Sequence, residues 1–197
     1  MSEVYLRSRL MMSPDDTSLL VVDVQEKLLN VIPDRASLVW NIQRLLEAAV
    51  VLDVRRIATE QYPEKLGSTT RELQPFVQPA SGKITFSCVG DAPFYDQLKK
   101  QSTTKVLVAG IESHVCVLQT VLDLIAAGYD VYVPVDAVAS RFEVDYQTAL
   151  KRMESSGATL VTTEMALFEW CQAAGSDRFK QISQLVRREK PSGRVDP

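Results

Sequence analysis

The sequence has few histidines, cysteines and glycines, and each shortage argues against a class of protein. One histidine in 197 residues cannot supply a histidine-rich metal site. Three cysteines cannot all pair with one another, which argues against the disulfide framework of a small secreted domain. Eight glycines and nine prolines are too few for a fibrous or disordered protein. We therefore expect reduced thiols in a cytoplasmic protein, with import into an organelle as an open alternative.

The chain also lacks an excess of basic charge and any long apolar run. Its net charge is −3 and its pI is about 5.3, whereas nucleic-acid binders normally present a basic face. No apolar stretch is long enough to span a membrane. We expect neither a nucleic-acid nor a membrane partner. Because 46% of the residues are hydrophobic, the chain can bury one sizeable core. A single domain over 1–197 is expected, with loose ends at 1–16 and 189–197.

Short β-branched runs alternate with longer helical patterns along the chain. Strands are predicted at 18–24, 56–60, 83–87, 105–109, 129–135 and 159–161. Helices are predicted at about 35–52, from a cap at Asp91 to 101, and from after Gly110 to 127. Further helices are predicted across 144–155, from the end of the sixth strand to about 174, and near 179–188. This alternation implies βαβ crossovers and a parallel sheet with helices on both faces. We expect an α/β, three-layer doubly wound sandwich with a six-stranded, mainly parallel sheet in the order 3-2-1-4-5-6.

The turns after the strands carry no phosphate-binding pattern. The turn after the first strand reads DVQEK over 23–27 and contains no glycine, which a nucleotide phosphate would require for close backbone approach. The turn after the fourth strand has Gly110 but no Gly-Lys-Ser/Thr run. Nucleotide binding by either route is therefore not expected.

Three other strand ends carry reactive side chains. Asp23 closes the first strand, Lys83 opens the third, and Cys116 follows the fourth in the first turn of a helix. A helix N-terminus favours a thiolate, a carboxylate could accept the thiol proton, and an ammonium could stabilise the ion pair. The residues alone leave a second interpretation open, since an aspartate at a strand end is often a helix cap and a cysteine in an apolar helix usually belongs to the core.

Each of these three residues lies in a distinct short motif. Asp23 lies in VVDVQEKL, Lys83 in GKITFSCV, and the run 110–116 reads GIESHVC. These motifs resemble those of the isochorismatase-like cysteine hydrolases, and their order, their spacings and the alternation of strands and helices match over nearly the whole chain. The runs TEQYP, GIE and SR, which begin at 59, 110 and 140, are most similar to an uncharacterised isochorismatase-domain-containing subgroup. Each motif is weak alone, and together, in order, they are fairly specific.

This resemblance implies a catalytic role for each of the three residues. Asp23 would deprotonate Cys116 and later activate water, while Lys83 would orient Asp23 and stabilise the thiolate. Cys116 would attack a carbonyl carbon and form an acyl-enzyme. The peptide between Ile111 and Glu112 matches a cis bond of the family, which would aim the amides of Glu112 and Cys116 at the developing oxyanion.

The substrate pocket and the cofactor requirement are also predicted. We expect the substrate to be bound by Leu28, Gln61, Tyr62, Glu112 and Arg141, the last as a possible partner of a carboxylate. No cofactor is expected. No metal is expected either, because the chain reads TEQ over 59–61 where nicotinamidases carry an Asp-x-His metal motif.

We expect the remaining polar and thiol residues to have mainly structural roles. His114 lies two residues from Cys116, which is an awkward helical spacing for direct activation, so we expect it at the pocket rim or the surface. Cys88 and Cys171 are expected to be packing residues. Ser87 could form a hydrogen bond near the site, and Asp136 is expected to anchor a loop or a cap.

These residues leave three functions open. The first is hydrolysis of a small amide, carbamoyl or related acyl compound through a Cys116 thioester. The second is cleavage of a vinyl ether, as in isochorismate-type hydrolases, by Asp23 without the cysteine. The third is a non-catalytic interaction module. The family habit of self-association implies a homo-oligomer that acts on a small molecule, and the sequence does not name that molecule.

Overall fold

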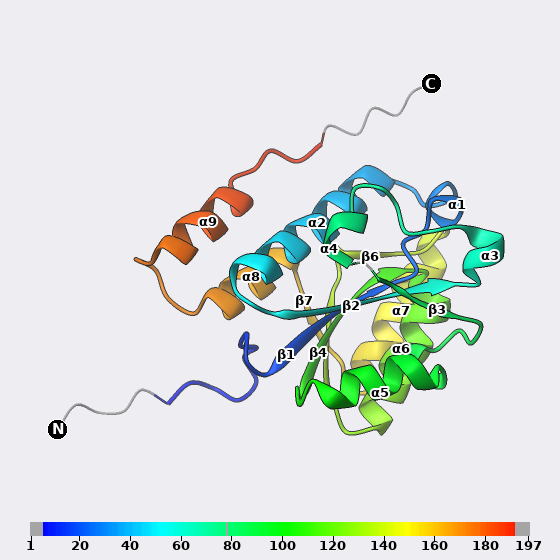
Figure 1. Ribbon diagram of the computed structural model, residues 1–197, viewed down its shortest axis with the longest axis horizontal. Coiled ribbons are helices and arrows are strands. Elements are labelled where there is room, and N and C mark those ends of the chain that lie inside the picture. The colour runs from blue at the N-terminus through cyan, green and yellow to red at the C-terminus, as the bar shows by residue number, and fades with distance from the viewer. Residues whose placement is uncertain (1–5, 78, 192–197) are drawn as a thin grey trace.

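The computed structural model describes residues 6–77 and 79–191, and Figure 1 shows helices on both faces of one sheet. The strands are β1 (Thr17–Val22), β2 (Arg55–Gln61), β3 (Ser81–Lys83), β4 (Lys105–Ile111), β5 (Asp130–Pro134), β6 (Val138–Ala139) and β7 (Thr159–Val161). The longer helices are α2 (Arg35–Val51), α5 (Ala92–Lys100), α6 (Leu118–Ala126), α7 (Glu143–Ser155), α8 (Thr163–Cys171) and α9 (Asp177–Val186). Shorter turns are α1 (Glu26–Leu29), α3 (Pro63–Leu66), α4 (Gln74–Val77), η1 (Cys88–Gly90) and the π-helical η2 (Ser113–Val117).

The sheet is parallel and has the order β3-β2-β1-β4-β5-β7, which confirms the predicted topology. A seventh, two-residue strand was not predicted. β5 pairs with β4 only as far as Leu107, and after Pro134 the chain turns back toward β4. There β6 pairs with Gly110 and Ile111. The carboxyl end of β4 therefore gains a hydrogen-bonded neighbour that the short β5 does not provide.

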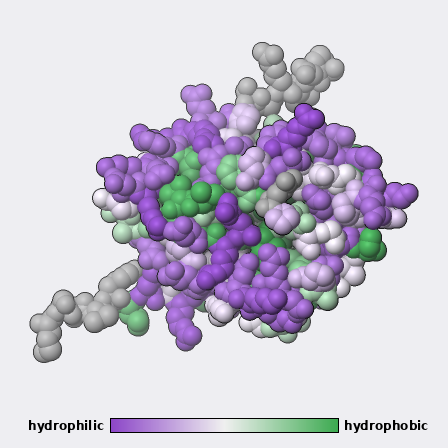
Figure 2. Space-filling view, viewed as in Figure 1, coloured by the Kyte–Doolittle hydropathy of each residue, from purple (hydrophilic) through white to green (hydrophobic). Residues whose placement is uncertain are grey.

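The two faces of the sheet bury different helices. Leu19 and Val21 belong to the core beneath α2, α8 and α9, whereas Leu20 and Val22 belong to the core beneath α5, α6 and α7. This follows from the two-residue period of a strand, which sends successive side chains to opposite faces. Figure 2 shows a mainly hydrophilic outer face with an apolar area where α2 and α9 lie in Figure 1. Among the described residues, no helix is both long and apolar enough to cross a bilayer.

The third strand is shorter and earlier than predicted. It covers Ser81–Lys83 rather than 83–87, so Lys83 ends this strand instead of opening it. The alternating pattern after Lys83 is misleading because Ile84 and Phe86 are exposed. The chain turns there so that the carbonyls of Thr85 and Phe86 accept hydrogen bonds from the Lys83 ammonium. A buried ammonium needs hydrogen-bond acceptors, and this need prevents the strand that the alternating pattern predicts after Lys83.

The segment before β1 differs from the loose end expected over 1–16. Met12 is fully buried, and its amide donates to the Glu169 carboxylate at 2.8 Å. The Arg7 guanidinium donates to the carbonyls of Met12 and Glu169, and the Lys105 ammonium donates to that of Met11. The described part of this segment is thus tied to α8 and β4. Residues 1–5 and 192–197 of the two expected ends lie outside the described residues.

Gly110 allows β1 and β4 to approach each other at the point where the strand order of the sheet reverses. Its φ is +125°, and it lies opposite Val22 in the parallel register. A side chain at this position would collide with the backbone oxygen and nitrogen of Val22. Glycine is therefore required here both for its backbone conformation and for the space it leaves.

Gly110→Ala should destabilise the fold more than the matched variant Gly128→Ala. Both glycines have positive φ, but nothing lies within 4 Å of a methyl group added at Gly128. We expect Gly128→Ala to cost about 1–2 kcal/mol from the backbone conformation alone, and Gly110→Ala to cost clearly more, because it adds the collision. Urea unfolding of the two variants measures the difference, and equal free energies of unfolding would contradict the steric requirement.

Candidate active site

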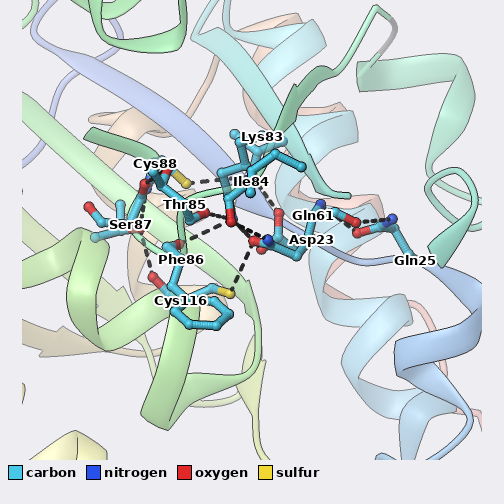
Figure 3. A network of polar contacts seen from close by, with 12 residues as sticks. Asp23, Gln25, Gln61, Lys83, Ile84, Thr85, Phe86, Ser87, Cys88 and Cys116 are labelled. Atoms are coloured by element: carbon cyan, nitrogen blue, oxygen red, sulfur yellow. Dashed lines mark hydrogen bonds and ion pairs between the residues drawn. The ribbon is translucent and has the colours of Figure 1, made fainter. Parts of the chain in front are cut away.

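The candidate site lies at the carboxyl ends of the central strands, where ligands bind in doubly wound sheets. Asp23 is the first residue after β1, and Lys83 is the last residue of β3. Cys116 lies in η2, which follows β4 after a single residue. Figure 3 shows these three side chains converging. The structure therefore brings together residues that are up to 93 positions apart in the sequence.

A buried ion pair occupies the centre of the site. The Lys83 ammonium donates to Oδ2 of Asp23 at 2.7 Å, and both side chains are fully shielded from solvent. Asp23 has a φ of +53°, a left-handed conformation that is uncommon for a residue other than glycine. Its amide donates to the carbonyl of Thr59 on the neighbouring strand. The turn after β1 thus points a carboxylate along the sheet edge toward Lys83.

Lys83 has more acceptors than protons. Besides Asp23 it donates to Oε1 of Gln61 at 2.6 Å and to the carbonyls of Thr85 and Phe86 at 3.1 Å each. An ammonium carries three N–H donors, so these four oxygens share them. The Lys83 amino group is therefore held in place by polar partners on several sides, as a buried polar group requires.

Gln61 connects this pair to the nucleophile candidate. Its Oε1 accepts from Lys83 and also from the Cys116 thiol, with 3.8 Å between sulfur and oxygen. Its Nε2 donates to the carbonyl of Ile84, which is consistent with this orientation of the amide. Gln25 holds the Gln61 backbone by exchanging hydrogen bonds with its amide and its carbonyl. Gln61 was predicted as a pocket wall, and the structure adds this bridging contact.

The surroundings of Cys116 favour the protonated thiol over the thiolate. Burial raises the pKa of the Cys116 thiol, and the negative charge of Asp23 raises it further, while Lys83 lowers it only in part. Cys116 is 6% exposed. The start of η2 favours a thiolate, as expected of a helix N-terminus, whereas burial and the nearby carboxylate act in the opposite direction.

Polar residues that sequence reasoning missed complete the surroundings. The Thr59 hydroxyl donates to Oδ1 of Asp23 at 2.8 Å and lies 3.5 Å from the Cys88 sulfur. The Thr120 hydroxyl donates to the Cys116 carbonyl at 2.7 Å and accepts from the Cys88 amide. Thr59 could have been found from its position on β2, two residues before Gln61, because residues two apart on a strand face the same side. Thr120 is one helical turn after Cys116, a spacing that the sequence does offer.

The peptide between Ile111 and Glu112 is cis, as expected. The Glu112 carboxylate, which is mostly buried, accepts three hydrogen bonds from Arg141: from its amide at 3.1 Å, from Nε at 3.0 Å and from Nη2 at 2.6 Å. Burial acts to raise the pKa of the Glu112 carboxyl, but the bonds from Arg141 hold it below its ordinary value. Arg141 was predicted to bind a substrate carboxylate, and in the structure its guanidinium already binds this one.

The other predicted residues have contacts of their own, outside the set formed by Asp23, Lys83, Gln61 and Cys116. His114 contacts the Ser140 hydroxyl at 2.9 Å from Nδ1 and is partly exposed. Leu28 packs against the core beneath α2, and Tyr62 is 38% exposed at the start of α3. Asp136 caps α8 by accepting from the amide and hydroxyl of Thr163, as expected of an anchor. Ser87 caps η1 by accepting from the Val89 amide. Within residues 6–77 and 79–191, no group of three or more His, Cys, Asp and Glu side chains could hold a metal ion.

A model of the isochorismatase domain matches residues 17–165 of the sequence. The chain belongs to the isochorismatase family. Among curated relatives, isochorismatase domain-containing protein 2 of Bos taurus is 39% identical over 179 residues, which are 90% of this chain and 86% of that protein. The match spans every strand and the whole candidate site. This isochorismatase-family chain is thus related to its curated relatives over nearly their full length.

Solved structures of the isochorismatase family share the fold. The MAR1 ribonuclease of Caenorhabditis elegans superimposes with a TM-score of 0.85 at 35% identity, and the superposition covers 95% of this chain and 97% of that one. The YcaC gene product of Escherichia coli, described as an octameric hydrolase of unknown specificity, superimposes with a TM-score of 0.83 at 22% identity. That superposition covers 91% of this chain and 92% of that one. At the lower identity the likeness concerns the fold alone.

Asp23→Asn should lower the pH at which the Cys116 thiol ionises. The substitution removes the negative charge that raises the pKa of the thiol and leaves the Lys83 charge that lowers it. We expect the pH profile of Cys116 alkylation by iodoacetamide, followed by mass spectrometry, to move to lower pH. Cys171 lies on α8 and provides a control within the same molecule, because its profile should not move. An unchanged or higher midpoint for Cys116 would contradict this electrostatic account.

Arg141→Met should cost about 1 kcal/mol of stability at neutral pH, since the Arg141 side chain is 47% exposed. The pKa of Glu112 lies below its ordinary value in the folded protein, so the pair stabilises the fold above the unfolded pKa. That stabilisation disappears as the pH falls through the folded-state pKa. Urea unfolding at pH 7 and at progressively lower pH should show the two proteins converging. Arg178→Met, which breaks an exposed pair with Asp53, is the control and should change little. A pH-independent difference would contradict this prediction.

Proposed function

We propose that this isochorismatase-family hydrolase cleaves a small amide, carbamoyl or related acyl substrate through a thioester on Cys116. The observation that carries the proposal is the buried Asp23–Lys83 ion pair, which Gln61 connects to the Cys116 thiol. A carboxylate, an ammonium and a thiol in one shielded site are the groups that nucleophilic acyl transfer requires. The single domain of 1–197 and the absence of a cofactor stay predictions within this proposal.

The first half-reaction begins with a protonated thiol. As the Cys116 sulfur attacks the carbonyl carbon, Asp23 accepts the thiol proton, and Lys83 stabilises the charge that passes between them. The resulting tetrahedral intermediate expels ammonia or an amine, which takes up the proton that Asp23 carries. In the second half-reaction Asp23 deprotonates a water molecule, which attacks the thioester and releases the acid and the free thiol.

The oxyanion of the tetrahedral intermediate would be bound by the backbone amides of Glu112 and Cys116. The pairing of the Glu112 carboxylate with the Arg141 amide and guanidinium supports this assignment, because it restricts the orientation of Glu112. The loss of one such donor typically lowers the rate by about a hundredfold to a thousandfold. Arg141 would then act through Glu112 and would orient the site.

The burial of the site favours a small substrate over a polymer. Asp23, Lys83 and Cys116 are at most 6% exposed, and the net charge of −3 supplies no excess of cations for a phosphate backbone. The ribonuclease activity in the name of the Caenorhabditis elegans protein is therefore not part of our proposal. A hollow of about 400 Å³ beside β6, lined by Val138, Ser140 and Tyr146 among others, has the size for a small molecule, although Asp23, Lys83 and Cys116 are not among its lining residues. Ala139 in this hollow pairs with Ile111, next to the cis peptide.

We also propose a homo-oligomer in a reducing, cytoplasmic environment. Ile84, Phe86 and Phe142 are more than half exposed, and the first two belong to the segment that supplies carbonyls to Lys83. Contact between subunits at such apolar positions would shield the site rim. The octameric state in the description of the Escherichia coli protein is a precedent. The three cysteines are free in the structure, as a reducing environment would require.

A screen for ammonia release over small primary amides and carbamoyl compounds tests the proposed function. In the wild type, at least one compound should be turned over. Cys116→Ala should abolish this turnover, and Asp23→Asn and Lys83→Ala should each lower kcat by about a hundredfold or more, since both remove acid–base chemistry. Mass spectrometry of a rapidly quenched reaction should show the acyl group on Cys116.

Cys171→Ala is the matched control for the loss of a thiol, because Cys171 lies on α8 outside the site, and it should keep wild-type activity. Full activity in Cys116→Ala would overturn the thioester mechanism. Cleavage of a vinyl ether that survives in Cys116→Ala would favour the isochorismate-type reaction. Turnover of no compound by the wild type, with Cys116 unmodified, would favour an interaction module.

A further inference from the structure

Both oxygens of the Asp23 carboxylate are bound by polar partners. Oδ2 accepts from Lys83, and Oδ1 accepts from the Thr59 hydroxyl at 2.8 Å. The Thr59 oxygen lies 3.5 Å from the sulfur of Cys88. Thr59 is 1% exposed and Cys88 is fully buried, so solvent cannot replace either contact. A chain of three side chains therefore leads from a cysteine outside the proposed mechanism to its general base.

The chemistry of the three groups determines the direction of this chain. An ionised carboxylate only accepts hydrogen bonds, so the single hydroxyl proton of Thr59 points to Asp23. The Thr59 oxygen then has only lone pairs to offer to Cys88, and the thiol must be the donor. Burial, together with the negative charge of Asp23, raises the pKa of Cys88 to about 11, so this thiol keeps its proton at neutral pH.

Cys88 is also fixed relative to the nucleophile. Its backbone amide donates to the Thr120 hydroxyl at 3.0 Å, and the same hydroxyl donates to the carbonyl of Cys116 at 2.7 Å. Thr120 thus joins η1 to the turn that carries the reactive sulfur. Movement of Cys88 would shift both the contact with Asp23, through Thr59, and the position of Cys116.

We propose that Cys88 and Thr59 form a hydrogen-bond relay that positions the Asp23 carboxylate and favours its ionised, proton-accepting form. This inference rests on the proposed function, in which Asp23 is the base. A thiol that donates to the Thr59 oxygen polarises its hydroxyl and strengthens the bond to Oδ1. Cys88 and Thr59 are positioning residues, since they act on the substrate only through Asp23.

The relay predicts the pH dependence of the enzyme. Hydrogen bonds to a carboxylate favour its charged form, so loss of a donor makes Asp23 easier to protonate. The ionisable groups around Asp23 are Lys83 from β3, Cys88 from η1 and Cys116 from η2, and Thr59 faces it from β2. Substitution of Thr59 leaves Lys83 and Cys116 in place, so a shift of the acid limb reports on the relay.

The first experiment needs no substrate. In a Cys116→Ala, Cys171→Ala background, Cys88 is the remaining thiol, and the frequency of its infrared S–H stretching band reports whether it donates a hydrogen bond. We expect Thr59→Val, which has the same shape without the oxygen, to move this band to the higher frequency of a free thiol. Thr59→Ser, which keeps the hydroxyl, should leave it in place. A band that Thr59→Val does not move would overturn the relay, whether or not the protein hydrolyses amides.

The second experiment measures kcat/KM against pH with the amide that the wild type hydrolyses fastest in the screen. Thr59→Val should move the acid limb to higher pH by about one pH unit, the size expected from one hydrogen bond to a charged group. Cys88→Ala should move it in the same direction by less. The conservative variants Thr59→Ser and Cys88→Ser should restore the limb, and the control Cys171→Ala should leave it unchanged. An acid limb that stays in place in Thr59→Val would overturn the role of the relay, while a wild type that hydrolyses no amide would overturn only the proposed function.

Discussion

The arrangement of the site depends on one buried ion pair, Asp23 with Lys83. Transfer of two charges out of water is costly, and the loss of one partner from such a pair typically destabilises a protein by about 3–5 kcal/mol. The surrounding polar groups offset this cost. Thr59 donates to the carboxylate, while Gln61 and the carbonyls of Thr85 and Phe86 accept from the ammonium. The ends of β1, β2 and β3 therefore have to converge, since each supplies part of this set.

The same pair also acts on the thiol of Cys116. Burial raises the pKa of this thiol most, the Asp23 carboxylate raises it further, and Lys83 lowers it only in part, so the protonated thiol is favoured. The proposed chemistry then couples proton transfer to the attack on the substrate, and the distance between base and sulfur becomes the critical quantity. Gln61 contacts the Cys116 thiol and Thr120 donates to the Cys116 carbonyl, so both restrict the position of the sulfur. A resting thiolate would need less precision and would be more open to oxidation.

The periphery of the site is more adaptable than this centre. The Glu112–Arg141 pair holds the cis peptide region from the solvent side, and the exposed residues Ile84, Phe86 and Phe142 belong to segments without regular strand pairing. The fold persists at 22% identity in the Escherichia coli protein.

Much of the fold follows from local patterns in the sequence. Continuous apolar runs predict the buried parallel strands, and the cap at Asp91 predicts the start of α5 correctly. The alternation after Lys83 predicts a longer strand, which is wrong because the ammonium draws the carbonyls of that segment inward. The two-residue β6 leaves no periodic pattern, so no local reading could find it.

For the site, the sequence determined which reactive residues follow which strands, and the order of motifs determined the family. Tertiary structure alone decided how those residues act on one another. These interactions are the contact of Gln61 with both Lys83 and Cys116, the bond from Thr59 to Asp23 and the rise in the pKa of the Cys116 thiol. All of them depend on burial and on distances of a few ångströms. The strength of an electrostatic interaction varies steeply with burial and with distance, and the spacing of residues along the sequence determines neither.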